Sequence, residues 1–241
     1  MDRGQAETRE DSILSASYRH RFLDGAVSPL PTGKVVCVAR SYREHARELH
    51  NQEAEEPILF MKPTSALVSF AEPIRLPHYS RACHFETEIA ILIGETLHRA
   101  TPDRVSRAIV GYAGALDLTL RDVQARLKQA GHPWELAKAF DRSCPMTPFI
   151  RSHDLLSDVK NGLRFSLHIN EELRQEGNTL DMTWDLLSLL ATISGYFTLD
   201  PGDVVLTGTP AGVGPLSPRD HLVLTIQGYH LFETTVAESS I

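Results

Sequence analysis

Three acidic residues lie in stretches that are otherwise apolar, and they are the first candidates for chemistry. Two of them, Glu86 and Glu88, belong to the run HFETEIAILI. In a β-strand, residues two apart share a face, which places these two Cα atoms roughly 7 Å apart. Two carboxylates on an apolar face repel each other, so one takes up a proton unless a cation compensates. The alternative is a pair of ordinary glutamates at a solvent-facing strand edge.

Asp117 is the third acid and lies in the run GALDLT. A buried, unpaired carboxylate is costly, so Asp117 either has a charged partner or caps a helix that begins near residue 118. Three carboxylates without a Cys/His cluster suit a hard divalent cation, Mg²⁺ or Mn²⁺, in octahedral geometry. Such a site keeps positions for water or a chelating substrate, and its lack of thiolates argues against structural zinc.

His45 and Glu48 lie three residues apart on a predicted short helix, and therefore on one face of it. A carboxylate that orients an imidazole is typical of a general base that takes a proton from water. The alternative is a solvated surface pair. A helix is predicted over residues 41–50 because Ser41 and Glu44 have the spacing of a capping box.

Cations and a hydroxyl complete the candidates. Arg121 and Gln124 lie one helical turn apart just after Asp117, where a guanidinium suits a substrate carboxylate; the alternative is a solvated helix face. Lys138 lies in the apolar run LAKAF and is either a snorkelling side chain or a desolvated cation aimed at an anion. Thr209 lies in the turn TGTPAGVGP, which is either a strand connection or an anion-binding loop.

Short strands dominate the elements that must position these side chains. Strands are predicted at 34–39, 58–61, 66–70, 84–93 and 111–119, a hairpin at 163–176, helices at 120–129 and 182–197, and a strand, a Gly-Pro loop and two strands over 203–236. The absence of βαβ alternation indicates a mixed α+β fold that is mainly β, a roll or sandwich with short helices. One domain, residues 34–241, is predicted to follow an N-terminal lead-in segment, residues 1–33.

Composition narrows the class of protein. The 241 residues include 24 Lys and Arg against 31 Asp and Glu, a net charge of −7 that weighs against nucleic-acid binding. No apolar run reaches the ~18 residues that span a bilayer, and the polar start of the chain lacks a signal-peptide core. Three scattered cysteines without a CxxC pair are typical of reduced thiols. A cytoplasmic protein without a membrane or nucleic-acid partner is therefore expected.

Seven blocks in the chain together resemble the fumarylacetoacetate hydrolase family, and more narrowly its small acylpyruvase and oxaloacetate decarboxylase-like members. In order they are KVVCVARSYREHARE, EEPILFMKP, HFETEIAILIG, GYAGALDLTLRDVQ, PWELAKAFDRSCP, INEELRQEGNT and LTGTPAGVGPL. The resemblance runs from about Lys34 to the C-terminus. It implies a mixed β-sandwich roll, a homodimer, and one Mg²⁺ or Mn²⁺ in each subunit.

The resemblance also implies roles for individual residues. The family's metal ligands fall on Glu86, Glu88 and Asp117. Its water-activating pair falls on His45 and Glu48, on a lid helix. Its substrate contacts fall on Arg121, Gln124, Lys138 and Thr209; we count Lys138 with the catalytic residues and add Arg40 to the substrate contacts. Two positions, Ser41 and Arg142, depart from the family pattern and bear on substrate choice.

The resulting hypothesis is a divalent-metal-dependent hydrolase of the C–C bond in acylpyruvate-type β-diketo acids, which releases pyruvate and a carboxylic acid through a metal-bound enolate. The same site would permit oxaloacetate decarboxylation or isomerisation and tautomerisation of 2-oxo-enedioates. Rival interpretations are a metal-dependent phosphodiesterase or nuclease, and a non-catalytic protein that binds the metal and a 2-oxo acid.

Overall fold

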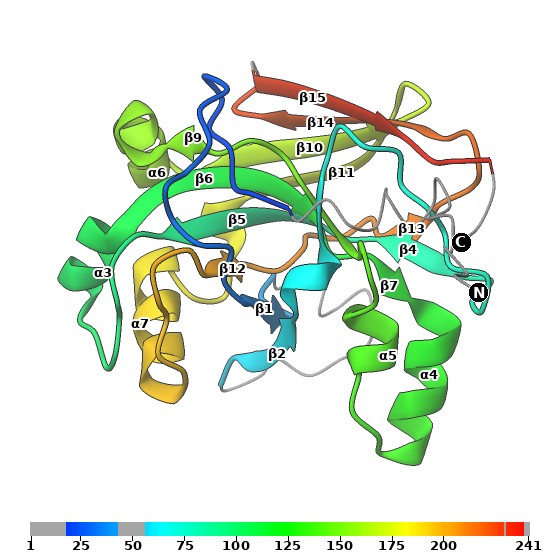
Figure 1. Ribbon diagram of the computed structural model, residues 1–241, viewed down its shortest axis with the longest axis horizontal. Helices are drawn as coiled ribbons and strands as arrows, with labels where there is room; N and C mark the ends of the chain where they lie inside the picture. Colours follow the sequence, from blue (N-terminus) through cyan, green and yellow to red (C-terminus); the bar gives the residue numbers. More distant parts are fainter. Residues whose placement is uncertain (1–17, 43–55, 229, 239–241) are drawn as a thin grey trace, which may run out of the picture.

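A mixed β-sheet crosses the centre of the molecule (Figure 1). The computed structural model describes residues 18–42, 56–228 and 230–238. In strand order the central sheet contains β2 (Ile58–Lys62), β1 (Val35–Ala39), β12 (Val204–Leu206), β5 (Thr87–Ile93), β6 (Ile109–Leu116), β8 (Cys144–Met146) and β3 (Leu67–Ser69), with β9 (Ile150–Arg151) paired to β6. Its pairs are antiparallel except β1 with β12 and β3 with β8, which are parallel.

Two smaller sheets accompany it. One contains β11 (Glu172–Asn178), β10 (Arg164–Ile169), β14 (His221–Ile226) and β15 (His230–Thr235), and the other contains β13 (Gly214–Pro215), β4 (Cys83–Phe85) and β7 (Thr119–Leu120). The four-stranded sheet packs closely on the central one, because a Cβ on Gly114 of β6 would lie 2.5 Å from the Leu224 side chain of β14. The predicted hairpin is confirmed, since β10 and β11 pair across a turn at Asn170 and Glu171.

Helices flank the sheets (Figure 1). They are α3 (Pro102–Ala108), α4 (Arg121–Ala130), α5 (Glu135–Lys138), α6 (Leu156–Asn161) and α7 (Leu186–Tyr196), with 3₁₀ turns η1 (Thr64–Ala66), η2 (Ser152–Leu155) and η3 (Thr179–Asp181). Gly131 ends α4 in the left-handed conformation, at φ 67°, as the sequence predicts. The second predicted helix begins later than residue 182, because Asp185 accepts a hydrogen bond from the Ser188 amide and so caps α7.

The central strand β5 is buried on both faces and divides its side chains between two cores. Ile89, Ile91 and Ile93 pack into the larger core, against the four-stranded sheet, whereas Ala90 and Leu92 face the smaller one. Because successive side chains of a strand point to opposite faces, both layers fix the position of this strand. Together with the three sheets and the short helices, this packing confirms the predicted mixed, mainly β architecture.

The described part of the predicted lead-in segment, residues 18–33, packs against the smaller core. Phe22 is buried there and forms a β-bridge with Phe149, while the His20 Nε2 atom lies 2.9 Å from the Gly202 carbonyl oxygen.

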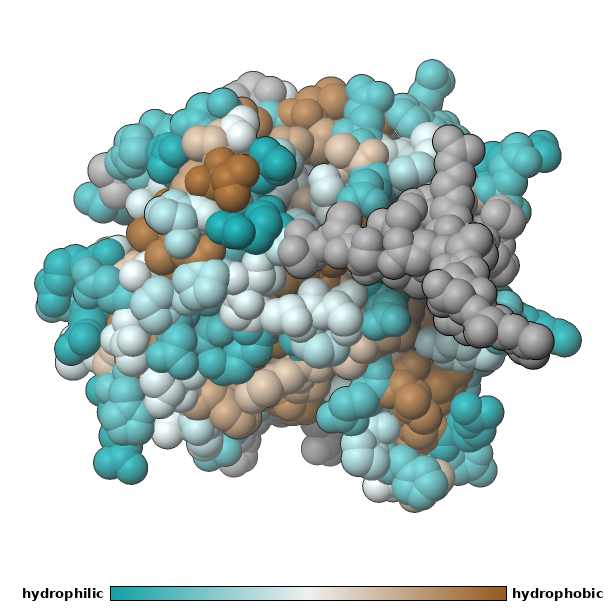
Figure 2. Space-filling model, in the orientation of Figure 1, coloured by the Kyte–Doolittle hydropathy of each residue, from teal (hydrophilic) through white to brown (hydrophobic). Residues whose placement is uncertain are grey.

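In the part of the chain that the structure describes, no helix has the length and apolarity needed to cross a membrane. Figure 2 shows a largely hydrophilic face, with apolar side chains gathered where α4 and α5 lie; Leu136 of α5 is exposed.

Candidate active site

A break between two strands brings the three predicted acids together. The sequence predicts one strand over residues 84–93, but β4 and β5 belong to different sheets, and Glu86 lies at the corner between them. β5 pairs antiparallel with β6, so Thr87 at the start of one strand lies opposite Leu116 at the end of the other. Asp117 follows directly, and its amide donates to the Glu86 carbonyl at 2.8 Å.

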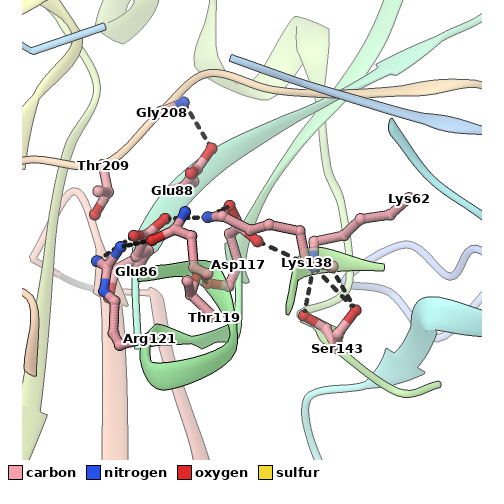
Figure 3. Close-up of polar contacts among 12 residues, drawn as sticks. Lys62, Glu86, Glu88, Asp117, Thr119, Arg121, Lys138, Ser143, Gly208 and Thr209 are labelled. Atoms are coloured by element: carbon pink, nitrogen blue, oxygen red, sulfur yellow. Dashed lines mark hydrogen bonds and ion pairs between the residues drawn. The ribbon is translucent and has the colours of Figure 1, made fainter. Parts of the chain in front are cut away.

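The side chains of Glu86, Glu88 and Asp117 form an acidic triad, buried, with one carboxylate oxygen from each lying within 4.8 Å of the others. Figure 3 shows the three side chains converging beside Lys138. The helix-cap alternative for Asp117 is wrong, because Leu120 is the N-cap residue of α4 and no side chain caps it. The solvent-exposed alternative for the two glutamates is wrong as well, because both are more than 90% buried.

Three cations neutralise the acidic triad. The Lys138 ammonium lies 2.6 Å from Glu86 Oε2 and 2.5 Å from Asp117 Oδ2, and the Arg121 guanidinium pairs with Glu86 Oε1. Lys62 Nζ lies 2.9 Å from Asp117 Oδ1, in an ionic contact outside hydrogen-bond geometry. The formal charges of the triad and these three cations sum to zero.

Lys62 is a member of the site that the sequence indicated only weakly, as a lysine in the apolar run ILFMKP. Its side chain has no solvent exposure. Besides its contact with Asp117, the ammonium donates to Ser143 Oγ at 2.9 Å and to the Lys138 carbonyl. Lys62 therefore joins the end of β2 to both an acid of the triad and the backbone of its neighbouring lysine.

Among the residues that the structure describes, Glu88 is the acid of the triad with which no cation pairs directly. Its Oε2 accepts a 2.6 Å hydrogen bond from the Gly208 amide. Burial, followed by the charges of Asp117 and Glu86, raises the pKa of Glu88 well above its ordinary value. The triad therefore favours either a proton or a further cation, and three hard carboxylate oxygens fit a divalent ion such as Mg²⁺ or Mn²⁺.

Lys138 keeps its proton in this setting. Burial alone would lower the pKa of the ammonium, but the carboxylates of Asp117 and Glu86 outweigh burial and raise the pKa above its ordinary value. The side chain is consequently a cationic hydrogen-bond donor and no general base. The snorkelling alternative is wrong, because Lys138 is 3% exposed.

The loop that carries Thr209 approaches the strands closely. Gly208 has φ +93°, and a Cβ there would lie 2.8 Å from the Ser41 Cβ and 3.0 Å from the Val38 carbonyl oxygen, so glycine is required. Ser41, at one of the two positions that depart from the family pattern, donates its hydroxyl to the Thr207 carbonyl. The helix that Ser41 was predicted to cap lies outside the described residues.

One pocket collects eight of the ten predicted site residues. Those eight are Arg40, Glu86, Glu88, Asp117, Arg121, Gln124, Lys138 and Thr209. The other two, His45 and Glu48, lie outside the described residues. Arg121 Nη1 donates to Gln124 Oε1 at 3.0 Å, and both side chains line the pocket and are partly buried, whereas Asp122 and Arg126 on the same helix are exposed.

The sequence did not single out three further residues of the pocket lining. Phe60 and Trp134 have ring centroids 6.2 Å apart, and Lys128 lines the pocket as well. Arg142, expected to influence the distal end of the substrate, lines a separate cavity and pairs with Glu72 at 2.8 Å. Its backbone has φ +61°, and its side chain is absent from the lining of the candidate site.

Comparison with known proteins shows which family and which relatives this chain is similar to. The sequence profile described as fumarylacetoacetate (FAA) hydrolase C-terminal matches residues 34–237. Oxaloacetate tautomerase YcgM of Escherichia coli K12 is 48% identical over 214 residues, which cover 89% of this chain and 97% of that protein. Human mitochondrial oxaloacetate tautomerase FAHD1 is 40% identical over 195 residues, 80% of this chain and 87% of that protein.

A solved structure gives the same fold with ligands. Fumarylpyruvate hydrolase from Pseudomonas aeruginosa, in complex with Mn²⁺ and pyruvate, superposes with a TM-score of 0.84 at 32% identity, covering 92% of this chain and 96% of that one. The predicted family-type β roll is thereby confirmed. With a matching profile over most of its length and relatives of this similarity, the chain belongs to the fumarylacetoacetate hydrolase family.

Proposed function

We propose that this chain is a divalent-metal-dependent enzyme of 2-oxo acids and that keto–enol tautomerisation of oxaloacetate is its reaction. The observation that carries the proposal is the buried acidic triad, which lines one pocket with Arg121 and Lys138. The relative at 48% identity, matched over 97% of its length, is named for that reaction.

The acidic triad would hold the cation, Mg²⁺ or Mn²⁺. When bound, the ion would act as a Lewis acid that polarises the keto group of a 2-oxo acid and stabilises the negative charge that develops there. The related fumarylpyruvate hydrolase holds Mn²⁺ together with pyruvate, the 2-oxo acid unit that oxaloacetate contains.

The protein's own cations would bind and orient the acid. Arg121 is held by Glu86 and Gln124, and its remaining N–H groups are suited to a carboxylate. Lys138 stays protonated and donates hydrogen bonds without removing a proton. The proton taken from the carbon next to the keto group would go to another base, and we propose His45, oriented by Glu48, for this role.

Charge favours a substrate with two carboxylates. The triad and its three paired cations are neutral together, so a divalent ion gives the site a net charge of two. Oxaloacetate is a dianion that neutralises this charge, whereas a simple acylpyruvate with one carboxylate does not. Burial makes such a match important, because uncompensated charge is costly in a low-dielectric site.

A second candidate is hydrolysis of the C–C bond of acylpyruvates, favoured by the similarity to fumarylpyruvate hydrolase. That reaction needs a water activated by His45 and Glu48, and it releases pyruvate, which tautomerisation does not. We retain the homodimer, the cytoplasmic location and the division of the chain at residue 33 as predictions.

The test is turnover of a panel of 2-oxo acids with Mg²⁺, Mn²⁺ or a chelator. Enol absorbance follows tautomerisation, and a coupled assay for pyruvate detects hydrolysis or decarboxylation. Asp117→Asn is expected to abolish turnover, whereas Asp103→Asn, at an exposed position of α3, serves as the matched control. Turnover that survives chelation and the Asp117 change would contradict the proposal.

A further inference from the structure

Gln175 is a buried polar residue in the middle of β11, a strand in which several other residues are exposed. Its side chain is 1% exposed, and it reaches from the four-stranded sheet to the loop that carries Thr209. A buried amide is costly unless its donors and acceptor are all satisfied. Here all of them are.

The partners of this amide fix its orientation. Gln175 Oε1 accepts from the Thr87 amide at 2.9 Å, and Nε2 donates to the Pro210 carbonyl at 3.0 Å. A backbone N–H can only donate and a backbone carbonyl can only accept, so the opposite orientation of the amide would lose both bonds. The remaining Nε2 hydrogen therefore donates to Thr209 Oγ1, 2.8 Å away.

This arrangement determines which way the Thr209 hydroxyl can act. A hydroxyl has one hydrogen, and here one of its lone pairs is taken by the Gln175 amide. Among the described residues, none accepts a hydrogen bond from Thr209, although the side chain is 4% exposed and lines the pocket. Its hydrogen is thus available to an acceptor inside the pocket, where Lys138 and Arg121 provide the other donors.

We infer that Gln175 is a positioning residue that holds Thr209 as a hydrogen-bond donor to an anionic oxygen of the bound acid. The inference rests on the proposed function, because it takes the occupant to be a 2-oxo acid. Gln175 touches no substrate itself. It acts through Thr209, by donating to one lone pair of that hydroxyl and so directing its hydrogen away from the Gln175 amide.

A double-mutant cycle tests the inference. A hydrogen bond to a charged group contributes enough binding free energy that its loss is readily measured. Thr209→Val should therefore raise the KM for oxaloacetate and the dissociation constant for pyruvate ~10- to 100-fold. Gln175→Leu should raise both values by a similar or smaller factor, with kcat less affected. In the Thr209→Val background, Gln175→Leu should add nothing, whereas Thr209→Ser, which keeps the hydroxyl, should raise both values much less than Thr209→Val does.

Controls separate positioning from general damage. Gln227→Leu removes another buried glutamine, which bonds the Gly162 carbonyl far from the pocket, and should leave KM unchanged. If Gln175→Leu does not give a cooperative thermal transition, the longer and unbranched Gln175→Met replaces it. Independent, multiplying effects of the Gln175 and Thr209 changes, or an unchanged KM in the single Gln175 variant, would overturn the inference. A parent protein that binds no pyruvate with Mn²⁺ present would instead contradict the proposed function.

Discussion

Replacing Lys62 by methionine tests whether the site's acids depend on buried cations. Methionine keeps the length and most of the volume of the side chain and removes only the ammonium. That ammonium has no solvent exposure, lies 2.9 Å from Asp117 Oδ1, and donates to Ser143 Oγ and the Lys138 carbonyl. Its loss leaves a buried carboxylate with one cation, Lys138, whereas the Lys138 carbonyl keeps the hydrogen bond that it accepts from Ser143 Oγ.

The loss of folding stability expected for Lys62→Met is large. Removing one partner of a buried ion pair costs roughly 3–5 kcal/mol when the other charge is left unpaired. Because Asp117 keeps Lys138 as a second cation, we expect a loss of about 3 kcal/mol, at the lower end of this range. Small domains have unfolding free energies of about 5–15 kcal/mol, so this change would remove a substantial part of the stability. The measurement is urea unfolding in the absence of divalent ions, where a lower midpoint with the same slope reports lost stability.

A second lysine provides the matched control. Lys34 also pairs with a buried aspartate, Asp203, but its side chain is 32% exposed, and that aspartate keeps the backbone amides of Lys34 and Asp200 as donors. Lys34→Met should therefore cost only about 1 kcal/mol. If Lys62→Met were no more damaging than Lys34→Met, the reasoning that the triad requires buried cations would be refuted.

Three further predictions follow from the site and the fold. A bound Mn²⁺ should stabilise the parent protein in thermal melts by about 2.7 kcal/mol at a hundredfold excess of ion over its dissociation constant, and Glu88→Gln should abolish this stabilisation; persistence of the shift would exclude Glu88 as a ligand. Gly208→Ala should lower stability by more than about 1 kcal/mol and weaken pyruvate binding, because a Cβ at φ +93° would meet Ser41; a normal melting temperature with normal binding would contradict this. His20 is buried, and burial lowers its pKa in the folded protein. Below about pH 6.5 the imidazole is therefore protonated in the unfolded chain but stays neutral in the folded protein, so the free energy of unfolding should fall as the pH falls. His20→Gln should flatten this acid dependence in urea unfolding, and an unchanged slope would show that other groups cause it.

Residue types and spacing were enough to predict the acids of the site, and their environment came from tertiary structure. Alternation in HFETEIAILI correctly placed Glu88 at a buried surface, but it also extended one strand through Glu86. That corner forms because β4 pairs with β7 and β13 while β5 pairs with β6 and β12. Which distant strands a segment pairs with does not change the local alternation of its side chains. The break between β4 and β5 therefore could not be predicted from the sequence.

The supporting residues were harder to predict for a similar reason. Gln175 lies in the polar run EELRQEGN, typical of an exposed hairpin, and only the packing of that hairpin against the Thr209 loop buries it. Lys62 gave a weak signal because one lysine at the end of an apolar run is common at strand ends. Asp117 left two interpretations open, and the contact with Lys62 and Lys138 decides between them.

The two-sided burial of β5 limits how this scaffold can diversify. Since isoleucines on one side and Ala90 and Leu92 on the other hold the strand in separate cores, no small adjustment can shift Glu88 without repacking both. Phe60 and Trp134 also line the pocket but are only partly buried, and neither carries a charge of the site. Laboratory evolution toward a new acid should therefore accumulate its accepted changes first at Trp134, since the Phe60 ring lies 5.0 Å from the Lys138 ammonium, while the carboxylate corner stays invariant.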